Sequence, residues 1–458
     1  MTHYRRMAGL HHRFMLLGQA RIAQAPHMRH AKAMNPTGYT LAPAQERLLI
    51  ALLALVQFVN MLDFVMVMPL GPDFAHALNI PNHSIGLVGG SYSFAAALAG
   101  ILSSPFLDKF PRKTAMLFCL AGVVVSTLAT TQVWDLHSML AARILAGAFG
   151  GQMMALSQAM VADFIPPQRR GAAMGAVAGG FAAASVVGIP FGLELSNYFG
   201  WQAPFVVAGL AGLVVLVIGQ WKLPYRAAMA AGDSLVRHFS RMGQLLANRH
   251  TLASYAMMGL AMGAGFLIVP NVSAHLQLNM GYPRDYLGLL YMCGGAVSFF
   301  SMRFSGYLVD KYSATMSASL FTTLVLIVTA IGFVFYAMPA ATVPMWIVVM
   351  IFVGFMVGMS GRNVCCMALS SKIPPPDQRG LYMSLQSAVT SFSAAVGAYG
   401  SSFILSEGGG HLLHVDRLGL MAIGISALVP LVVQYVECNL RRRLKAEASS
   451  LAATPPVV

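Results

Sequence analysis

The sequence predicts an all-α polytopic membrane protein with twelve transmembrane helices in two pseudo-symmetric six-helix bundles. Two observations lead to this prediction. The chain of 458 residues is 57% hydrophobic and only 10% charged, whereas soluble domains carry about 25% charged residues. Apolar runs of about 20 residues, long enough to cross the hydrocarbon core of a bilayer as a helix, recur along the whole chain. An ordinary soluble protein is therefore excluded.

A polar stretch divides the twelve apolar runs into two groups of six. The runs cover Leu48 to Leu70, Ile85 to Leu107, Thr114 to Val133, Leu136 to Val161, Ala172 to Leu195, Ala203 to Trp221, Leu252 to Ala274, Tyr286 to Phe304, Thr315 to Met338, Val343 to Leu369, Leu381 to Leu405 and Leu418 to Val436. We therefore expect five segments, namely a basic tail over residues 1–46, an N-terminal bundle over 47–221, a cytoplasmic linker over 222–250, a C-terminal bundle over 251–438 and a second tail over 439–458.

The formal net charge of +14 could indicate a nucleic-acid partner, but its distribution favours another explanation. Lysine and arginine gather in both tails and in alternate loops, while the loops of the opposite side hold only Arg284 and Arg417. Cytoplasmic loops of membrane proteins carry an excess of these residues. We therefore expect both termini in the cytoplasm and no nucleic-acid partner. The expected location is the bacterial inner membrane.

The first tail has no acidic residue before Glu46 and offers Met34 as an alternative start. We expect it to be disordered or partly untranslated. A helix on the membrane surface and an organelle presequence stay open as alternatives.

The two halves repeat one pattern. IPPQRRGAAMG (Ile165 to Gly175) matches IPPPDQRGLYM (Ile373 to Met383), and each follows a run rich in small residues. SPFLDKFPRK (Ser104 to Lys113) matches GYLVDKYSAT (Gly306 to Thr315), and both place Asp and then Lys at the cytoplasmic end of a run. Two matches at equivalent loops indicate a duplicated six-helix unit.

Asp63 lies in the middle of the first run, VQFVNMLDFVMVMP, where a carboxylate costs roughly 2.5 to 3.5 kcal/mol. Gln57 and Asn60 precede it at intervals of three and share its helix face. Arg143 in the fourth run is expected at a similar depth, within reach of Asp63. Desolvation favours the neutral carboxyl group and a nearby arginine favours the charged one, so the pair could load and release a proton. A purely structural pair is the alternative interpretation.

Other polar residues within the runs leave more than one interpretation open. Arg362 could face the cavity and hold an anionic substrate, or it could extend to the inner surface. We take Gln57, Asn60 and Arg362 as candidate substrate-cavity residues. Glu194 is expected at the membrane interface, and His275 beyond the seventh run is ambiguous.

These residues resemble the major facilitator superfamily, and within it the twelve-helix drug:proton antiporter and arabinose-efflux-permease-like group. The family's loop signature reads G-x-L-x-D-[RK]-x-G-[RK]-[RK]. In the first copy Asp108, Lys109, Arg112 and Lys113 match, whereas Ser104, Phe106 and Pro111 depart; the second copy keeps Gly306, Leu308, Asp310 and Lys311. The fourth run carries Arg143-x-x-Ala-Gly147, similar to the family's R-x-x-Q-G.

The resemblance implies two bundles that rock about a central cavity lined mainly by the first, fourth, seventh and tenth helices. It also implies a cytoplasmic gate, in which an Asp faces the N-terminus of a neighbouring helix and Arg112 pairs with Asp163. Ordinary anchoring by basic residues is the alternative. The expected gate residues are Asp108, Lys109, Arg112, Lys113, Asp163, Gly306, Asp310 and Lys311.

The fifth run contains Gly188-Ile-Pro190-Phe-Gly192, which resembles part of the antiporter motif. Proline beside small residues kinks a helix and lets bundles meet closely. The match favours export over uptake, although a kink needed only for packing would look the same.

No catalytic or nucleotide-binding motif accompanies these features. The sequence has neither H-E-x-x-H nor G-x-x-x-x-G-K-[ST], and its five cysteines show no paired spacing. We expect no enzyme activity, no cofactor and no metal. The predicted function is a secondary active transporter, working as a monomer in the lipid bilayer, that exports a small organic or drug-like molecule in exchange for protons. The alternatives are a proton-linked importer of a small metabolite and, less favoured, a membrane enzyme or scaffold without transport.

Overall fold

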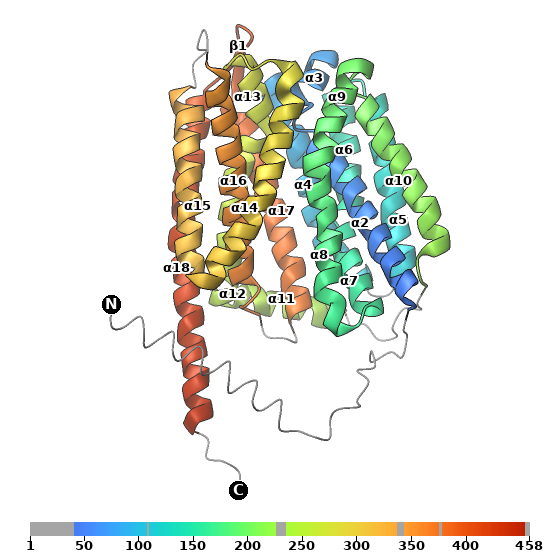
Figure 1. Ribbon diagram of the computed structural model, residues 1–458, viewed down its shortest axis with the longest axis vertical. Coiled ribbons are helices and arrows are strands. Elements are labelled where there is room, and N and C mark those ends of the chain that lie inside the picture. The colour runs from blue at the N-terminus through green and yellow to red at the C-terminus, as the bar shows by residue number, and fades with distance from the viewer. Residues whose placement is uncertain (1–40, 108–109, 226–234, 337–342, 375–377, 454–458) are drawn as a thin grey trace.

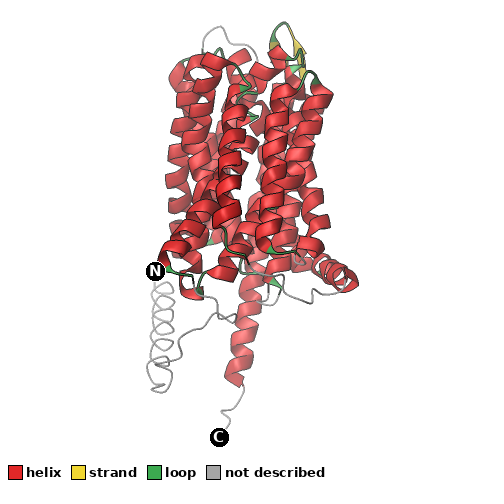
Figure 2. Ribbon diagram, turned by 90° about the vertical axis from the view of Figure 1, so that its right-hand side faces the viewer, coloured by secondary structure: helices red, strands yellow, loops and turns green. Residues whose placement is uncertain are grey.

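The computed structural model describes residues 41–107, 110–225, 235–336, 343–374 and 378–453. In these residues the chain is almost entirely helical, and its long helices run side by side along one axis (Figures 1 and 2). Eleven helical stretches of this part are long and apolar enough to cross a membrane. Because lipid offers no partner to backbone N–H and C=O groups, spanning segments must be helical. The predicted all-α polytopic fold is confirmed.

The N-terminal half is built from nine α-helices with short 3-10 or π segments between them in the described residues. They are α2 (Pro43–Met66), α3 (Gly71–Ala77), η1 (Asn82–Ser84), α4 (Ile85–Leu107), α5 (Arg112–Ala129), η2 (Thr130–Gln132), α6 (Leu136–Gly150), α7 (Met153–Phe164), α8 (Pro167–Ala183), η3 (Ala184–Gly188), α9 (Ile189–Phe199) and α10 (Ala203–Lys222).

The C-terminal half adds one small hairpin to its helices. Its elements are α11 (Leu235–Ala247), α12 (Arg249–Ile268), η4 (Val269–Asn271), α13 (Val272–Leu278), η5 (Arg284–Tyr286), α14 (Leu287–Lys311), α15 (Ala314–Thr329), η6 (Ala330–Phe335), α16 (Met345–Ser370), α17 (Arg379–Ile404), β1 (Ser406–Gly408), β2 (His411–Leu413) and α18 (Val415–Ala453). The strands pair antiparallel, and their turn uses Gly409 and Gly410 at φ of 62° and 79°, a conformation that glycine adopts without steric cost.

Equivalent helices contact each other in both halves. In the first half α2 packs on α8, α4 on α6 and α5 on α10; in the second half α12 packs on α17, α14 on α16 and α15 on α18. This repetition agrees with the duplicated six-helix unit that the loop motifs indicate.

One expected span differs in character from the others. The run from Leu381 to Leu405 coincides with α17, a 26-residue helix that packs between α4 and α12. It does not belong to the eleven apolar stretches, because serine, glutamine and threonine interrupt its hydrophobic sequence. The count of twelve spans therefore stays a prediction at α17.

The helix boundaries differ from the expected runs at both ends of the chain. The first helix of the described residues, α2, begins at Pro43, since proline suits the first turn of a helix and the Gln45 side chain accepts the Ala42 backbone N–H. The last helix continues to Ala453, well past the expected end at Val436. The expected linker contains α11, whose Met242 and Leu245 are buried. Most of the first tail, residues 1–40, lies outside the described residues.

The two ends of the helix assembly carry different elements, and we name them accordingly. The hairpin end carries β1, β2, α3 and α13, whereas the α11 end carries α11, the start of α2 and the C-terminal part of α18 (Figures 1 and 2). The two halves meet along α4 and α17 and along α9 and α14. At the hairpin end Gly86 and Gly90 of α4 lie directly against Ala398 and Tyr399 of α17.

A further close contact joins α4 to α6 inside the N-terminal half and leads to a prediction. A Cβ atom on Gly147 would overlap with the backbone of Tyr92. We expect Gly147→Ala to lower the free energy of unfolding by about 1 to 3 kcal/mol, the usual cost of overpacking, as measured by thermal unfolding in detergent. Gly175→Ala is the matched control, because nothing lies within 4 Å of its added Cβ. Equal stability of both variants would contradict the close approach of α4 and α6.

Candidate functional site

Asp63 on α2 and Arg143 on α6 form an ion pair that is fully buried in the N-terminal half. Arg143 Nη1 lies 3.0 Å from Asp63 Oδ2, and Nη2 lies 3.2 Å from Oδ1. Both side chains are 0% exposed. Thr127 Oγ1 donates to Asp63 Oδ1 at 2.8 Å, and Arg143 Nη2 also donates to Thr130 Oγ1. The structure therefore brings together the two residues that the sequence places at one depth.

The pair is bidentate, but one N–H donor of Arg143 forms no hydrogen bond among the described residues. Arg143 Nε is buried without a hydrogen-bond partner among the described residues, and its guanidinium carbon lies 5.6 Å from the centre of the Phe205 ring. Attraction offsets the desolvation of a buried pair only when the remaining donors are also bonded. The ion pair of Asp63 and Arg143 is therefore buried with one N–H donor, Arg143 Nε, that forms no hydrogen bond among the described residues.

Gln57 and Asn60 continue the polar face of α2 toward α6 and α7. Gln57 Nε2 donates to Ser157 Oγ at 2.9 Å, and Asn60 Nδ2 donates to the Gly150 carbonyl at 3.2 Å. Tyr92 OH donates to Asn60 Oδ1 at 3.2 Å. Both side chains are buried inside the N-terminal half. Their expected place in a substrate cavity stays a prediction, because in this conformation they bond to neighbouring helices.

Arg362 lies on α16, buried in the C-terminal half, and its hydrogen bonds go to neutral groups. Nη1 donates to Ser426 Oγ at 3.1 Å, and Nη2 donates to the Ala261 carbonyl at 2.8 Å. Its side chain does not reach the surface. In the described part of the chain no carboxylate forms a salt bridge with it. Arg362 is therefore a buried cation without the acidic partner that Arg143 has.

The described residues among those expected at the cytoplasmic gate lie at the α11 end. Arg112 Nε is 3.8 Å from Asp163 Oδ2, as the expected pairing requires, and Lys113 Nζ donates to the Gln220 carbonyl at 2.6 Å. Asp108 and Lys109 lie outside the described residues.

In the second copy of the motif, Lys311 Nζ lies 5.4 Å from the centre of the Tyr307 ring, Asp310 is exposed and nothing lies within 4 Å of a Cβ built on Gly306. The gating role of these residues stays a prediction.

The Gly188, Pro190 and Gly192 segment interrupts the fifth span of the N-terminal half. Residues Ala184–Gly188 form a π-helical segment directly before α9. Proline lacks the N–H that an α-helix would need at this point, and π segments of this kind mark irregular helices. Gly188 and Gly192 let this segment approach Leu62 and Met66 of α2, on either side of Asp63. The segment therefore packs beside the buried ion pair.

An ion pair between the halves at the hairpin end was not expected from the sequence. Asp73 on α3 pairs with Arg284 of η5, with Arg284 Nε 2.9 Å from Oδ1 and Nη2 2.5 Å from Oδ2. The two side chains are 23% and 21% exposed. Arg284 Nη2 also donates to Ser196 Oγ at 3.3 Å. The scarcity of charge in the loops of this side was the one signal that could have singled out Arg284.

A second polar contact between the halves lies at the same end. Glu407 on β1 accepts the Asn82 backbone N–H at 2.8 Å and its side-chain Nδ2 at 2.9 Å. Together with Asp73 and Arg284, these residues form what we call the hairpin-end latch. Each contact joins the N-terminal half to the C-terminal half, so both must break if this end opens.

Two other polar residues occupy places away from the pair. Glu194 of α9 accepts from Asn197 at 3.4 Å near the hairpin end. His275 of α13 is buried, with Nε2 2.8 Å from the Gly332 carbonyl and its ring beside Phe333. Neither contacts Asp63 or Arg143.

The fold and the buried pair define a polytopic membrane protein of two repeated helical halves. The sequence matches the Major Facilitator Superfamily over residues 53–398, and the chain therefore belongs to this family. Structural similarity agrees with this assignment. A bacterial homologue of the human lysosomal transporter Spinster, solved inward-facing and unoccupied, has a TM-score of 0.65 at 13% identity over 88% of this chain and 99% of that one. The nucleoside transporter NupG has a TM-score of 0.67 at 13% identity over 85% and 99%.

The curated relatives match this chain over different shares of its length. YtbD of Bacillus subtilis, described as an MFS-type transporter, is 22% identical over 48% of this chain and 55% of its own length. A probable sugar efflux transporter of Pasteurella multocida is 28% identical over 41% of this chain and 47% of its own length. YbcL of Bacillus subtilis, also described as an MFS-type transporter, is 21% identical over 83% and 95%. The chain thus spans about half the length of two of these three relatives.

Proposed function

We propose that this protein is a secondary active transporter that exports a small organic solute in exchange for protons. The observation that carries the proposal is the buried ion pair of Asp63 and Arg143, because an ionisable group kept inside a membrane helix is costly and typically belongs to a transport or proton pathway. Membership of a family whose curated relatives are described as transporters supports it.

The proposed orientation places the α11 end in the cytoplasm, with both termini on that side. The basic residues of the loops and tails support this orientation. The hairpin-end latch then faces the outside and is closed in this conformation. Transport by alternating access requires the latch to open while contacts at the α11 end form.

Proton coupling is proposed to act through the charge on Asp63. When Asp63 binds a proton, its attraction to Arg143 weakens, and the arginine keeps only neutral acceptors such as Thr130 Oγ1 and the Asp63 carbonyl. α2 is then freer to move relative to α6. When the proton leaves, the bidentate pair forms again. Proton binding and helix position are therefore linked, since each favours one arrangement of the pair.

The proposed substrate contacts come from both halves of the protein. Arg362 offers a positive charge without an acidic partner in the described residues, and a polar or anionic part of a solute could bond to it in a conformation that exposes α16. Gln57 and Asn60 are proposed to contribute hydrogen bonds from α2 in the same conformation. The printed name of the Pasteurella relative makes sugars one class of compound to test.

Inside-out vesicles provide the test of exchange. Respiration acidifies the vesicle lumen, and a fluorescent dye reports the pH gradient while sugars, organic acids and lipophilic cations are added in turn. We expect at least one compound to collapse the gradient with the protein and not in vesicles prepared without it. If no compound does, while right-side-out vesicles accumulate one of them under an imposed inward proton gradient, the protein is an importer and the export proposal is wrong.

A further inference from the structure

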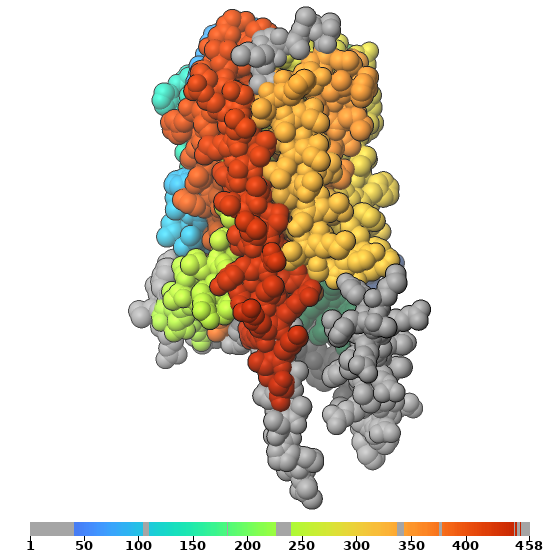
Figure 3. Space-filling view, turned by 90° about the vertical axis from the view of Figure 1, so that its left-hand side faces the viewer, coloured from blue at the N-terminus to red at the C-terminus, as the bar shows by residue number. Residues whose placement is uncertain are grey.

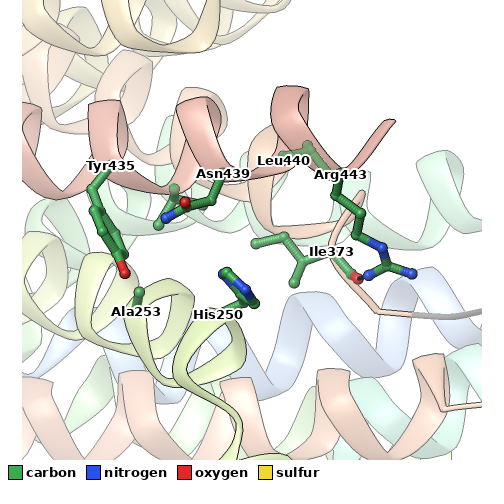
Figure 4. A pocket seen from close by; sticks show the side chains of 8 residues that line it. His250, Ala253, Ile373, Tyr435, Asn439, Leu440 and Arg443 are labelled. Atoms are coloured by element: carbon green, nitrogen blue, oxygen red, sulfur yellow. Dashed lines mark hydrogen bonds between the residues drawn. The ribbon is translucent and has the colours of Figure 1, made fainter. Parts of the chain in front are cut away.

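A small pocket, open to solvent on one side, lies at the α11 end between α12 and the C-terminal part of α18. Figure 4 shows His250 from the first turn of α12 facing Asn439 and Arg443 of α18 across the pocket, with Tyr435 at one side. Ile373, from the segment after α16, also lines it. None of the residues described so far as transport residues contributes to this pocket.

The polar groups that line the pocket are mainly hydrogen-bond donors. Asn439 Nδ2 is buried and has no hydrogen-bond partner among the described residues. Arg443 also lines the pocket, and its Nη1 donates to the Ile373 carbonyl at 3.4 Å. The imidazole of His250 carries at least one N–H in either protonation state. A ligand that satisfies these groups must bring acceptor atoms.

Charge also favours an anion. The lining residues include no Asp or Glu. Glu437 of α18 faces another helix, because it accepts the Thr315 backbone N–H at 2.7 Å and its hydroxyl at 2.6 Å. The N-terminus of α12 adds a positive partial charge close to His250. The residues that line the pocket therefore bring the positive charge of Arg443 and no carboxylate of their own.

The surroundings indicate where such an anion comes from. Tyr435, at the edge of the pocket, is 49% exposed, and Leu431 and Leu428 continue along the same face of α18 at 62% and 47% exposed. Figure 3 shows α18 along the outside of the assembly with α11 beside its lower part. Tyrosine is common where membrane and water meet. An acyl chain can follow this apolar face while its headgroup occupies the pocket.

We propose that this pocket binds a phosphate group, supplied as the headgroup of an anionic phospholipid from the membrane leaflet at the α11 end. Basic pockets between transmembrane helices recognise such headgroups through charge and hydrogen bonds. In this site Arg443 and His250 contact the phosphate oxygens and Asn439 Nδ2 gains its missing acceptor. The lipid joins α12 to α18 and stabilises their contact. The proposal does not depend on the substrate or on the direction of transport.

The test uses the purified full chain in detergent, with thermal unfolding and native mass spectrometry as the readouts. Short-chain phosphatidylglycerol, phosphatidylcholine with the same acyl chains, and inorganic phosphate are the three probes. We expect phosphatidylglycerol to raise Tm at concentrations at least about tenfold lower than phosphatidylcholine, since a ligand stabilises the folded state according to the ratio of its concentration to its Kd. Equal effects of the two lipids would overturn the proposal. A full effect of inorganic phosphate alone would overturn the lipid as its source.

Two variants and one matched control locate the effect. Arg443→Gln should reduce the apparent affinity for phosphatidylglycerol about tenfold, whereas Arg442→Gln, which removes the same charge from the neighbouring exposed position, should leave it nearly unchanged. Asn439→Leu should retain the Tm of the lipid-free protein, because it removes an unbonded donor, and still weaken the lipid effect. If Arg442→Gln and Arg443→Gln lose affinity equally, diffuse surface charge explains the binding and the pocket is not the site.

Discussion

Replacing Asp63 with asparagine is expected to abolish proton-coupled transport, with a loss of at least about 100-fold in the rate at which substrate collapses the pH gradient. The substitution removes the group that is proposed to bind the proton and leaves Arg143 as a buried cation without its partner. Removing one member of a buried pair typically costs about 3 to 5 kcal/mol. We therefore expect a lower Tm in detergent as well, and both quantities are measured on the same preparation.

The double variant Asp63→Asn with Arg143→Gln distinguishes the two interpretations of the pair. It removes both charges and should recover most of the stability that the single variant loses. If the pair serves only to hold the N-terminal half together, transport recovers with stability. If Asp63 carries the proton, the double variant is stable and still fails to couple substrate movement to the pH gradient. Recovery of coupled transport would show that the coupling role is wrong.

A matched control separates the loss of the charge on Asp63 from the loss of any buried hydrogen bond of α2. Ser157→Ala removes the acceptor of Gln57, a neutral hydrogen bond of 2.9 Å on the same polar face of α2. It should lower stability by about 1 kcal/mol and preserve coupling. A loss of coupling in this variant as large as that of Asp63→Asn would mean that any disturbance between α2 and α7 stops transport.

The sequence was sufficient to predict the fold and the central pair. Long apolar runs specify helices because the bilayer excludes other structures, and a lone carboxylate among them can be matched to the one arginine expected at its depth. The sequence was less informative where hydropathy is ambiguous. α17 carries enough serine to fall below the apolarity of its neighbours, and α18 extends past Val436 because its polar continuation, from Cys438 to Ala453, is also a good helix-forming sequence.

Contacts between the halves could not be derived in the same way. Asp73 and Arg284 are 211 positions apart, and both lie in short segments between spans, where no periodicity fixes the direction of a side chain. The same holds for Asn82 and Glu407. The burial of Gln57 and Asn60 depends on how α2 is rotated about its own axis. Residues at intervals of three share one face of a helix, but this spacing does not tell which neighbouring helix that face meets.

Reversing the charge of Asp73 is expected to prevent stable closure of the hairpin end. In Asp73→Arg, two guanidinium groups face each other where a bidentate pair now joins α3 to η5. The wild-type pair is partly exposed, so its own contribution is about 1 kcal/mol, but like charges brought together at an interface cost several kcal/mol. We expect transport to fall by at least about tenfold. The double variant Asp73→Arg with Arg284→Asp restores the opposite charges and should recover most of the activity.

The conformation of this end can be followed directly through a cysteine at Gly288. A Cβ at this position lies 3.5 Å from the Pro190 carbonyl across the interface of the halves, so a cysteine fits there, and it is half-buried in the closed conformation. With the exposed Cys293 and Cys438 replaced by serine, labelling of Gly288→Cys by a membrane-impermeant maleimide should be several-fold faster in Asp73→Arg. The charge swap should slow it again, because the latch closes. Equal labelling rates in all three proteins would mean that Asp73 and Arg284 do not control access from the hairpin end, whatever their effect on transport.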